Sequence, residues 1–458
     1  MKKENSNTGR AQFSSGIAVF FATLSSAVGL GNIWRFPYML GENGGGSFLF
    51  LYLLCILLVG MPLLIFEFYM GRKSRKNVVG AFTKLSNSKK WGRVGIISCI
   101  GSFCQLFFYT TVAGWIYSYV FKGFRGDFVG ATNASAKLHF FNVVNTPMWA
   151  LFWQFVVISI VTGILILGVK NGIEKITKTL MPVLFGLIVF CVIKALMLPN
   201  AFAGVKTLFS VDLSKITMSA VLFALGLSFF KLALGSGAMV TYGSYFTEDN
   251  NIVSTTIKLI LADTAVSVLV ALIIFPALSS FGLRMDEGKG LLFSVMPIVF
   301  SNMNFGKALL IIFFTLTSIA ATCSMLAVFE VPVAYFSEEK HMSRTKAVLL
   351  VSSIVLGFGA LATLSATPDS ILHKVPFFPI FDFASSNIIF PIAGLCTSIF
   401  IGFFTKKEDI LDELTNHGAL KNEKIINVFY FLVKYITPVL LSIVFINLIL
   451  SSVFRFIR

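Results

Sequence analysis

Eleven long apolar segments follow one another along the 458 residues of this chain, and they limit its possible folds more than any other feature. A helix needs about 20 apolar residues to cross a bilayer, and every segment reaches that length. Only 13% of the residues are charged, whereas a soluble domain has about 25%. The sequence therefore predicts an all-α polytopic membrane protein, with residues 1–458 forming one domain. The predicted spans are residues 13–38, 46–70, 93–121, 148–169, 174–198, 214–246, 253–281, 306–336, 345–365, 378–404 and 427–454.

Lysine and arginine gather in alternate connections between these segments, most densely in residues 71–93. Connections rich in lysine and arginine stay on the cytoplasmic side of a membrane, so we predict a cytoplasmic N-terminus and, with eleven spans, an external C-terminus. The net charge of +16 lies in these short loops and does not indicate nucleic-acid binding. We expect a multi-pass protein of the plasma membrane, the inner membrane of a bacterium.

The stretch 25–37 interrupts the first apolar segment with residues that a lipid-facing helix tolerates poorly. It holds two glycines, an asparagine, Arg35 and a proline. Broken backbone at membrane depth survives where it lines a cavity or is buried in protein. A charge at that depth is by default a functional residue. The alternative is a kinked helix whose arginine reaches the lipid headgroups.

A second break lies in the sixth segment, where glycines and serines cluster around Lys231. Broken helices at corresponding positions of two five-helix halves indicate an inverted-repeat transporter, although both breaks have packing kinks as an alternative. We expect residues 13–198 and 214–404 to form the two repeats and residues 427–454 an additional helix. The binding site then lies near the middle of the membrane, where helix N-termini face an anionic group.

Charges inside the predicted spans form two candidate pairs. Lys231 near the centre of its span costs about 2.5–3.5 kcal/mol on insertion scales, and Asp263 in the seventh span is its candidate partner. Arg35 in the first span can pair with Asp382 in the tenth. Both pairs have a purely structural salt bridge as their alternative. No histidine and no metal-ligand spacing occur in the spans, so an enzyme is not indicated, and the continuous polar lining of a channel is missing.

Several long motifs resemble the neurotransmitter:sodium symporter family with its LeuT-like bacterial amino-acid transporters. They are AVGLGN at residues 27–32, WRFP at 34–37, ENGGG at 42–46 and MGR at 70–72, and the resemblance continues to Asp382 over nearly the whole chain. The resemblance implies a LeuT-type fold of two inverted five-helix repeats, with helices one and six broken. It also implies import of an amino acid, with sodium, by alternating access.

The resemblance also implies a substrate site between the two breaks. The substrate carboxylate would meet the backbone of residues 27–31 and the hydroxyl of Tyr109, with Phe230 as a roof. Small residues opposite the side chain and a polar Gln105 suggest an amino acid larger or more polar than leucine. The implied substrate-binding residues are Ser26, Ala27, Leu30, Gly31, Gln105, Tyr109, Phe230, Lys231, Ala233, Ser236, Ser324, Ala327 and Val328.

Gating residues follow from the same resemblance. Arg35 and Asp382 would form the outer gate, and Arg10 with Glu338 or Glu339 the inner gate, close to Tyr245. Gly172 and Pro182 match a Gly-x9-Pro pattern whose unwinding opens the cytoplasmic path.

The first sodium site departs from the family pattern. Its ligands would be the Ala27 carbonyl, the Asn32 side chain, a hydroxyl after Phe230 and an asparagine in span seven; here Lys231 and Asp263 hold the last two places. An ammonium can donate hydrogen bonds to carbonyls, to Asp263 and to the substrate carboxylate, and it repels a second cation by about 4 kcal/mol at 4 Å in an effective dielectric of 20. We therefore predict that Lys231 replaces this sodium ion and that Asn32 faces its ammonium.

The second sodium site keeps most of its implied ligands. It would use the carbonyl oxygens of Ser25, Val28 and Ala320 with the side chains of Cys323 and Ser324. The thiol of Cys323 stands where the family has a hydroxyl, and sodium prefers oxygen, so the site is weakened. We expect one coupled sodium ion and no other cofactor.

Other ion couplings stay open as alternatives. Chloride dependence is not expected, because Lys231 lies beside Tyr52 and Ser267, which resemble parts of the family's chloride site, and Leu227 lacks a donor. The main alternative is a sodium-independent or proton-coupled carrier or exchanger in which the Lys231–Asp263 pair carries the proton. A channel is the remote alternative. The oligomeric state and the particular amino acid do not follow from the sequence.

Overall fold

The computed structural model describes residues 11–283 and 291–457, and within these ranges the regular structure is helical, without strands. The first predicted span consists of α1 (Gly16–Ala27), a π-helical turn (Gly31–Arg35) and α2 (Phe36–Glu42), with a bend of 50° at the break. The sixth consists of α11 (Met218–Lys231) and α12 (Ala238–Gly243). Both predicted interruptions are therefore present as breaks in the helices.

Nine helices of the described part are long and apolar enough to cross a membrane, and the bent first pair makes ten. The two halves of the sixth span are each too short to be counted, and with them the eleven predicted segments are accounted for. The uninterrupted or only locally widened spans are α3–α4 (Gly46–Ser74), α6 (Lys89–Arg125), α8 (Pro147–Ile166), the turn Val169–Glu174 with α9 (Lys175–Leu196), α13 (Ile252–Ser280), α15 (Gly306–Glu338), α16 (Arg344–Ala366), α17–α18 (Phe377–Phe404) and α20–α21 (Glu423–Ile457).

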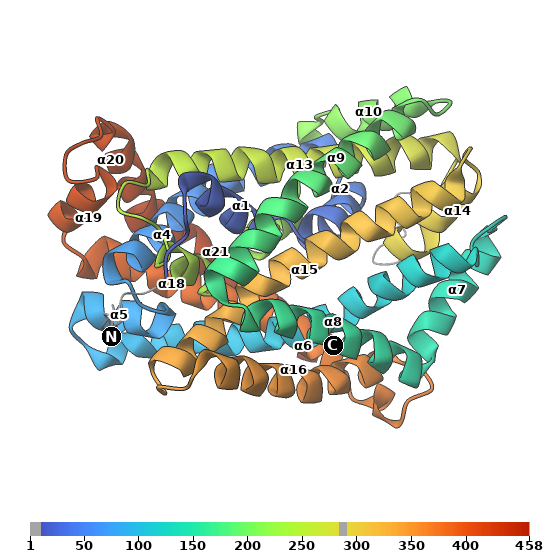
Figure 1. Cartoon of the computed structure of the whole chain (residues 1–458). Helices are drawn as coiled ribbons and strands as arrows, with labels where there is room; N and C mark the ends of the chain where they lie inside the picture. The colour runs from blue at the N-terminus through green and yellow to red at the C-terminus, as the bar shows by residue number, and fades with distance from the viewer. Residues whose placement is uncertain (1–10, 284–290, 458) are drawn as a thin grey trace.

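Short helices cover the two ends of the bundle (Figure 1). At one end lie α5 (Val78–Ser86) and α19 (Lys407–Leu414); at the other lie α7 (Asn133–Asn145), α10 (Ala201–Phe209) and α14 (Met296–Ser301). α5 lies within the lysine- and arginine-rich connection 71–93, and α7, α10 and α14 lie at the opposite end of the bundle from it.

A polar clamp fixes the helices that surround the breaks. The Gln154 amide of α8 donates to Thr110 of α6 (2.9 Å), and its carbonyl oxygen accepts from Thr363 of α16 (2.9 Å). All three side chains are buried, so these bonds join three spans in a setting where water is excluded. These bonds therefore tie α8 and α16 to α6, the helix that carries Gln105 and Tyr109.

Candidate functional site

The first break exposes backbone groups that a continuous helix would satisfy internally. Val28 leaves the helical conformation (φ −81°, ψ 100°). The amide of Gly29 donates to the side-chain oxygen of Asn32 (3.3 Å) instead of closing a further turn onto Ser25. The amide of Leu30 donates to the hydroxyl of Tyr109 (3.0 Å). Backbone donors and carbonyl oxygens are therefore available in the middle of the bundle.

The second break is built from residues with positive φ. Ala233, Gly235 and Gly237 have φ angles of 51°, 73° and 82°. A Cβ on Gly235 would lie 2.2 Å from the carbonyl oxygen of Phe390, so only glycine fits. The Gly235 amide donates to the buried carboxylate of Glu67 (2.8 Å), which ties the break to α4 (Met61–Ser74).

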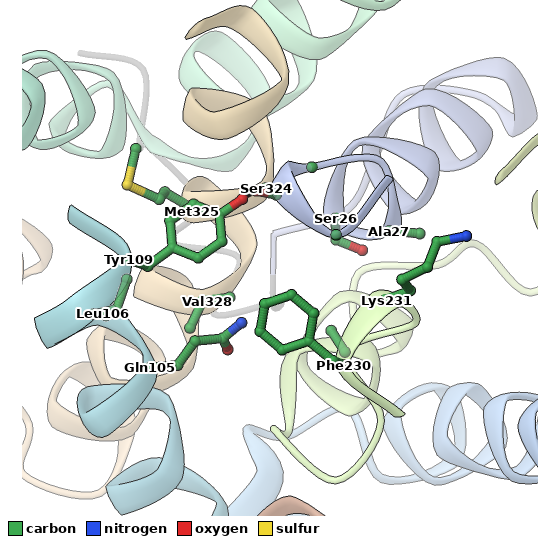
Figure 2. Close-up of a pocket in the computed structure, with 13 residues that line it drawn as sticks. Ser26, Ala27, Gln105, Leu106, Tyr109, Phe230, Lys231, Ser324, Met325 and Val328 are labelled. Carbon is green, nitrogen blue, oxygen red and sulfur yellow. Dashed lines mark hydrogen bonds between the residues drawn. The ribbon is translucent and has the colours of Figure 1, made fainter. Parts of the chain in front are cut away.

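The two breaks meet at a small closed cavity (Figure 2) with a volume of about 20 Å³, room for about one water molecule. Its lining residues come from the first break, α6, the second break and α15. They are Ser26, Ala27, Gly29, Gly31, Gln105, Leu106, Tyr109, Phe230, Lys231, Ala233, Ser324, Met325 and Val328. An amino acid is larger than this volume, so it can enter only if these side chains move apart.

Most of the predicted substrate residues lie at this cavity, but three do not line it. Leu30 contributes its backbone amide to Tyr109. The hydroxyl of Ser236 donates to the Ala233 carbonyl (2.5 Å) and accepts from the Ala238 amide (3.2 Å), so it supports the break itself. Ala327 is buried in α15 outside the lining.

Sequence reasoning missed two side chains of the lining, Leu106 and Met325, and included Gly29 only as part of the backbone of residues 27–31. Leu106 and Met325 adjoin the predicted Gln105 and Ser324, but a motif does not indicate which neighbour of a matched position turns toward a cavity. Gly29 carried a usable signal, since a glycine inside a broken motif marks a close approach of other groups.

Tyr109 and Ser324 close one side of the cavity. Their hydroxyls lie 2.5 Å apart, and Tyr109 also accepts from the Leu30 amide. Both side chains are buried. This set of one backbone donor and two hydroxyls is suited to a carboxylate, because each group can donate a hydrogen bond to an oxygen anion.

Lys231 lies at the end of α11 with its ammonium in a cage of oxygen atoms. Its Nζ is 3.0 Å from the Asp263 carboxylate and donates to Tyr52 (2.7 Å) and to Ser267. The rings of Phe36 and Tyr52 lie 4.7 and 4.6 Å from the same nitrogen. The Lys231 and Asp263 side chains are 0% exposed, so the two charges compensate each other away from water.

The predicted position of this ammonium was partly wrong. We expected it to face Asn32 and to reach the substrate carboxylate, but Figure 2 shows Lys231 extending away from Phe230 and Gln105. Its three protons have three partners outside the cavity, and its stem packs against Gly31, where a Cβ would lie 3.0 Å away. The ammonium thus lies beside the two residues that resemble the family's chloride site.

Asn32 contacts the partner of Lys231 instead. Its amide donates to the Asp263 carboxylate (2.6 Å), to the Asp263 backbone carbonyl (3.1 Å) and to Ser267 (3.0 Å). The first break, α11 and α13 are therefore joined through a single buried carboxylate.

The predicted second sodium site lies across α1 and α15. Ser25, Val28, Ala320, Cys323 and Ser324 are buried, and the loss of the helical turn after Ser25 frees carbonyl oxygens there. Oxygen atoms of this kind fit a hard cation, whereas the Cys323 thiol does not. Ser324 also contacts Tyr109, so any ion bound there would lie beside the cavity.

The outer gate residues lie above the cavity in contact with each other. Arg35 Nη1 is 3.6 Å from the Asp382 carboxylate, and Ser386 lies within 3.3 Å of both. The guanidinium stacks over the Phe230 ring at 4.4 Å. Arg35, Asp382 and Ser386 also line a second, wider cavity of about 670 Å³, so they lie between it and the small cavity.

The inner gate is described only in part, because Arg10 lies outside the described residues. Glu338 accepts from the backbone (3.0 Å) and side chain (3.1 Å) of Asn77. A second pair nearby was missed as a site: Arg344 binds the buried Glu330 through two nitrogens (2.9 and 2.8 Å), and Tyr245 donates to Glu330 (2.7 Å). A fully buried acid in α15 followed by an arginine at the start of α16 was a usable signal.

The Gly-x9-Pro segment is wound in this structure. Gly172 belongs to the π-helical turn Val169–Glu174, where a Cβ would lie 2.1 Å from the Ile164 carbonyl oxygen, and Pro182 lies inside α9. Glu174 accepts from the backbone amide of Ser14 (2.9 Å). The start of the first span is therefore tied to the start of the fifth.

Two broken helices that meet at a closed cavity, with a closed gate above it, define a transporter with a central binding site. Comparison with known proteins gives the family. A model described as the sodium:neurotransmitter symporter family matches residues 10–137 and 139–455, and the chain belongs to this family of membrane transporters, which are not enzymes.

Relatives span the whole chain. An uncharacterized sodium-dependent transporter, YhdH, of Bacillus subtilis is 34% identical, over 96% of this chain and 97% of its own length. An uncharacterized sodium-dependent transporter of Haemophilus influenzae is 32% identical, over 96% and 98%. The crystal structure of MhsT in complex with L-phenylalanine is similar with a TM-score of 0.88 and 35% identity, over 96% of this chain and 99% of that one. The LeuT-type fold expected from the motifs is thereby confirmed.

Proposed function

We propose that this chain imports an amino acid by alternating access, coupled to one sodium ion, with the Lys231 ammonium in place of a first ion. The observation that carries this proposal is the buried Lys231–Asp263 pair (3.0 Å), held by Asn32 of the first break directly behind the cavity. Relatives named as sodium-dependent transporters and the MhsT complex with L-phenylalanine support the coupling ion and the substrate class.

The substrate carboxylate binds at the first break. It takes the place of the contact between Tyr109 and Ser324 and receives hydrogen bonds from the Tyr109 hydroxyl and the Leu30 amide. The substrate side chain then points toward Gln105, Phe230 and Val328. Because the residues that the structure describes in the lining include no carboxylate and the Lys231 ammonium is already paired with Asp263, we infer a neutral side chain.

The coupling ion binds beside the carboxylate. Ser25, Val28 and Ala320 contribute backbone carbonyls, Ser324 a hydroxyl and Cys323 a weak thiol ligand. A sodium ion there draws α1 toward α15 and holds the cytoplasmic side closed. Opening then requires loss of the Ser14–Glu174 tether and unwinding at Gly172, with Pro182 as the fixed end of the unwound stretch.

Transport is directed into the cytoplasm of a bacterial cell. The Arg35–Asp382 side faces outward, and the end with α5 and α19 faces inward, in line with the density of lysine and arginine between residues 71 and 93. The chain needs no chloride, because the Lys231 ammonium lies beside Tyr52 and Ser267 and donates a hydrogen bond to each of their hydroxyls.

Sodium replacement tests the proposed coupling. Purified protein in liposomes should accumulate a radiolabelled neutral amino acid when external sodium is present, with uptake falling at least about 10-fold when choline replaces it. Chloride replacement by gluconate should leave uptake unchanged. Sodium coupling would be refuted if uptake were complete in choline and were abolished by collapse of a pH gradient. Transport would then be coupled to protons, with the Lys231–Asp263 pair carrying the proton.

Cys323→Ser should strengthen sodium binding. A hydroxyl oxygen is a better ligand for sodium than a thiol, so the sodium concentration for half-maximal uptake should fall about 3- to 10-fold. The matched control is Cys191→Ser, a buried cysteine of α9 that lies away from the proposed site. An unchanged or weaker sodium dependence in Cys323→Ser would contradict the assigned ligand set.

A further inference from the structure

Gln105 presents an unused hydrogen-bond acceptor at the cavity. Its side chain is only 4% exposed, it lines the cavity, and its Oε1 accepts no hydrogen bond from the described residues. Figure 2 shows its amide end directed toward Phe230, across the space between α6 and the second break. A buried acceptor that folding leaves unpaired is costly, so it indicates a ligand group that completes the bond.

The rest of the side-chain region is apolar. Leu106 and Met325 have no polar hydrogen, and Val328 and the Phe230 ring add apolar walls. Ser26, the other polar side chain here, already donates to the Thr23 carbonyl (2.8 Å). Gln105 is therefore the polar group in the described lining that remains open to a substrate side chain.

The charges around the cavity further limit which substrate side chains can bind. An ammonium or guanidinium side chain would need a carboxylate, but Asp263 is occupied by Lys231 and Asn32. A carboxylate side chain would be buried without a counter-charge, because the Lys231 ammonium in the described lining is already paired with Asp263. The group that fits is a neutral N–H or O–H donor at the end of a mainly apolar side chain.

We propose that Gln105 selects substrates whose neutral side chain carries an N–H or O–H donor, as in the indole of tryptophan or the phenol of tyrosine. This inference rests on the proposed amino-acid transport. A site built to hydrogen-bond one substrate group rejects analogues that lack it, because the partner is left buried and unpaired. Gln105 is thus a specificity-determining residue whose preference can be measured as a ratio.

The test compares matched pairs of free amino acids on the purified full-length protein in sodium buffer. Tyrosine is compared with phenylalanine, and tryptophan with 3-benzothienylalanine, in which sulfur replaces the indole N–H. Thermal unfolding and competition against a bound radioligand give the affinities. We expect the donor-bearing member of each pair to bind at least about 10-fold more tightly to the wild type.

Gln105→Met removes the acceptor at similar volume and should reduce both ratios to about one or reverse them. Ile100→Met changes an exposed position of the same helix, α6, outside the cavity and should leave both ratios as in the wild type. Equal affinities within each wild-type pair, or ratios that survive Gln105→Met, would overturn the inference while amino-acid binding stands. If no amino acid binds or is taken up by the wild type, the proposed function fails and this inference fails with it.

Discussion

Lys231→Met alone should reduce amino-acid uptake by about 100-fold or more. The substitution leaves Asp263 as an unpaired carboxylate with 0% exposure, and breaking a buried ion pair in this way costs about 3–5 kcal/mol. Ser267 would lose the hydrogen bond from Lys231, and Asn32 would be left with an Asp263 carboxylate that the ammonium no longer holds in place. Asp263→Asn alone should be similarly damaging, because the ammonium then has no counter-charge. Initial uptake rates in proteoliposomes, normalised to folded protein, measure both effects.

Combining Lys231→Thr with Asp263→Asn should restore transport and create a second sodium site. The pair then supplies a hydroxyl and an amide oxygen beside the Asn32 side chain, without a fixed cation. At 4 Å and an effective dielectric of 20, the Lys231 charge repels a sodium ion by about 4 kcal/mol. Removal of this charge should therefore raise the affinity of the site for sodium by about 1,000-fold. The Hill coefficient for sodium should rise from about one toward two.

The matched control is Lys258→Thr, an exposed lysine one turn before Asp263 on α13, which should change neither rate nor sodium dependence. Equilibrium binding of radioactive sodium should likewise rise from one ion to two per protein in the double variant alone. A double variant that transports normally with a Hill coefficient near one would refute the ammonium as an ion substitute, even if both single variants are inactive.

The breaks themselves were predictable because local chemistry dictates them. A run with Gly29, Gly31, Arg35 and Pro37 cannot continue as a lipid-facing helix, whatever surrounds it. The eleven apolar segments were likewise recognisable from length alone. The Lys231–Asp263 pair was predictable because an unpaired charge inside the membrane is costly in free energy. Asp263 in the seventh span was the nearest candidate of opposite charge for Lys231 in the sixth.

The direction of Lys231 was not predictable from the chain order. It depends on Gly31 leaving room for the lysine stem and on Tyr52 and Ser267 supplying acceptors from two other spans. Both hydroxyls were known from the sequence, but the rotamer that brings the ammonium to them is set by three-dimensional packing. The same holds for Ser236, whose hydroxyl bonds its own backbone, an option that a motif match does not reveal.

Gly29→Ala should abolish substrate binding while the protein remains folded. A Cβ at this position would lie 2.5 Å from the Ser324 hydroxyl oxygen, 2.7 Å from the Ser324 Cβ and 2.8 Å from the Tyr109 hydroxyl. These two side chains are the proposed carboxylate site, so the added methyl group occupies the space where the substrate carboxylate binds. We expect affinity to fall at least about 100-fold, measured by the substrate-induced rise in unfolding temperature and by uptake.

The expected loss of affinity in Gly29→Ala comes from steric exclusion of the substrate carboxylate and not from misfolding. Two measurements separate these causes. Gly163→Ala in α8 places a Cβ in open space and should leave affinity and unfolding temperature nearly unchanged. Gly29→Ala should still purify as a monodisperse protein with the wild-type helix content, since the nearest atoms belong to the Ser324 and Tyr109 side chains, which can move away from the methyl group, and not to the backbone. If Gly29→Ala keeps wild-type affinity, the carboxylate does not bind between Tyr109 and the first break, and the substrate must lie elsewhere in the bundle.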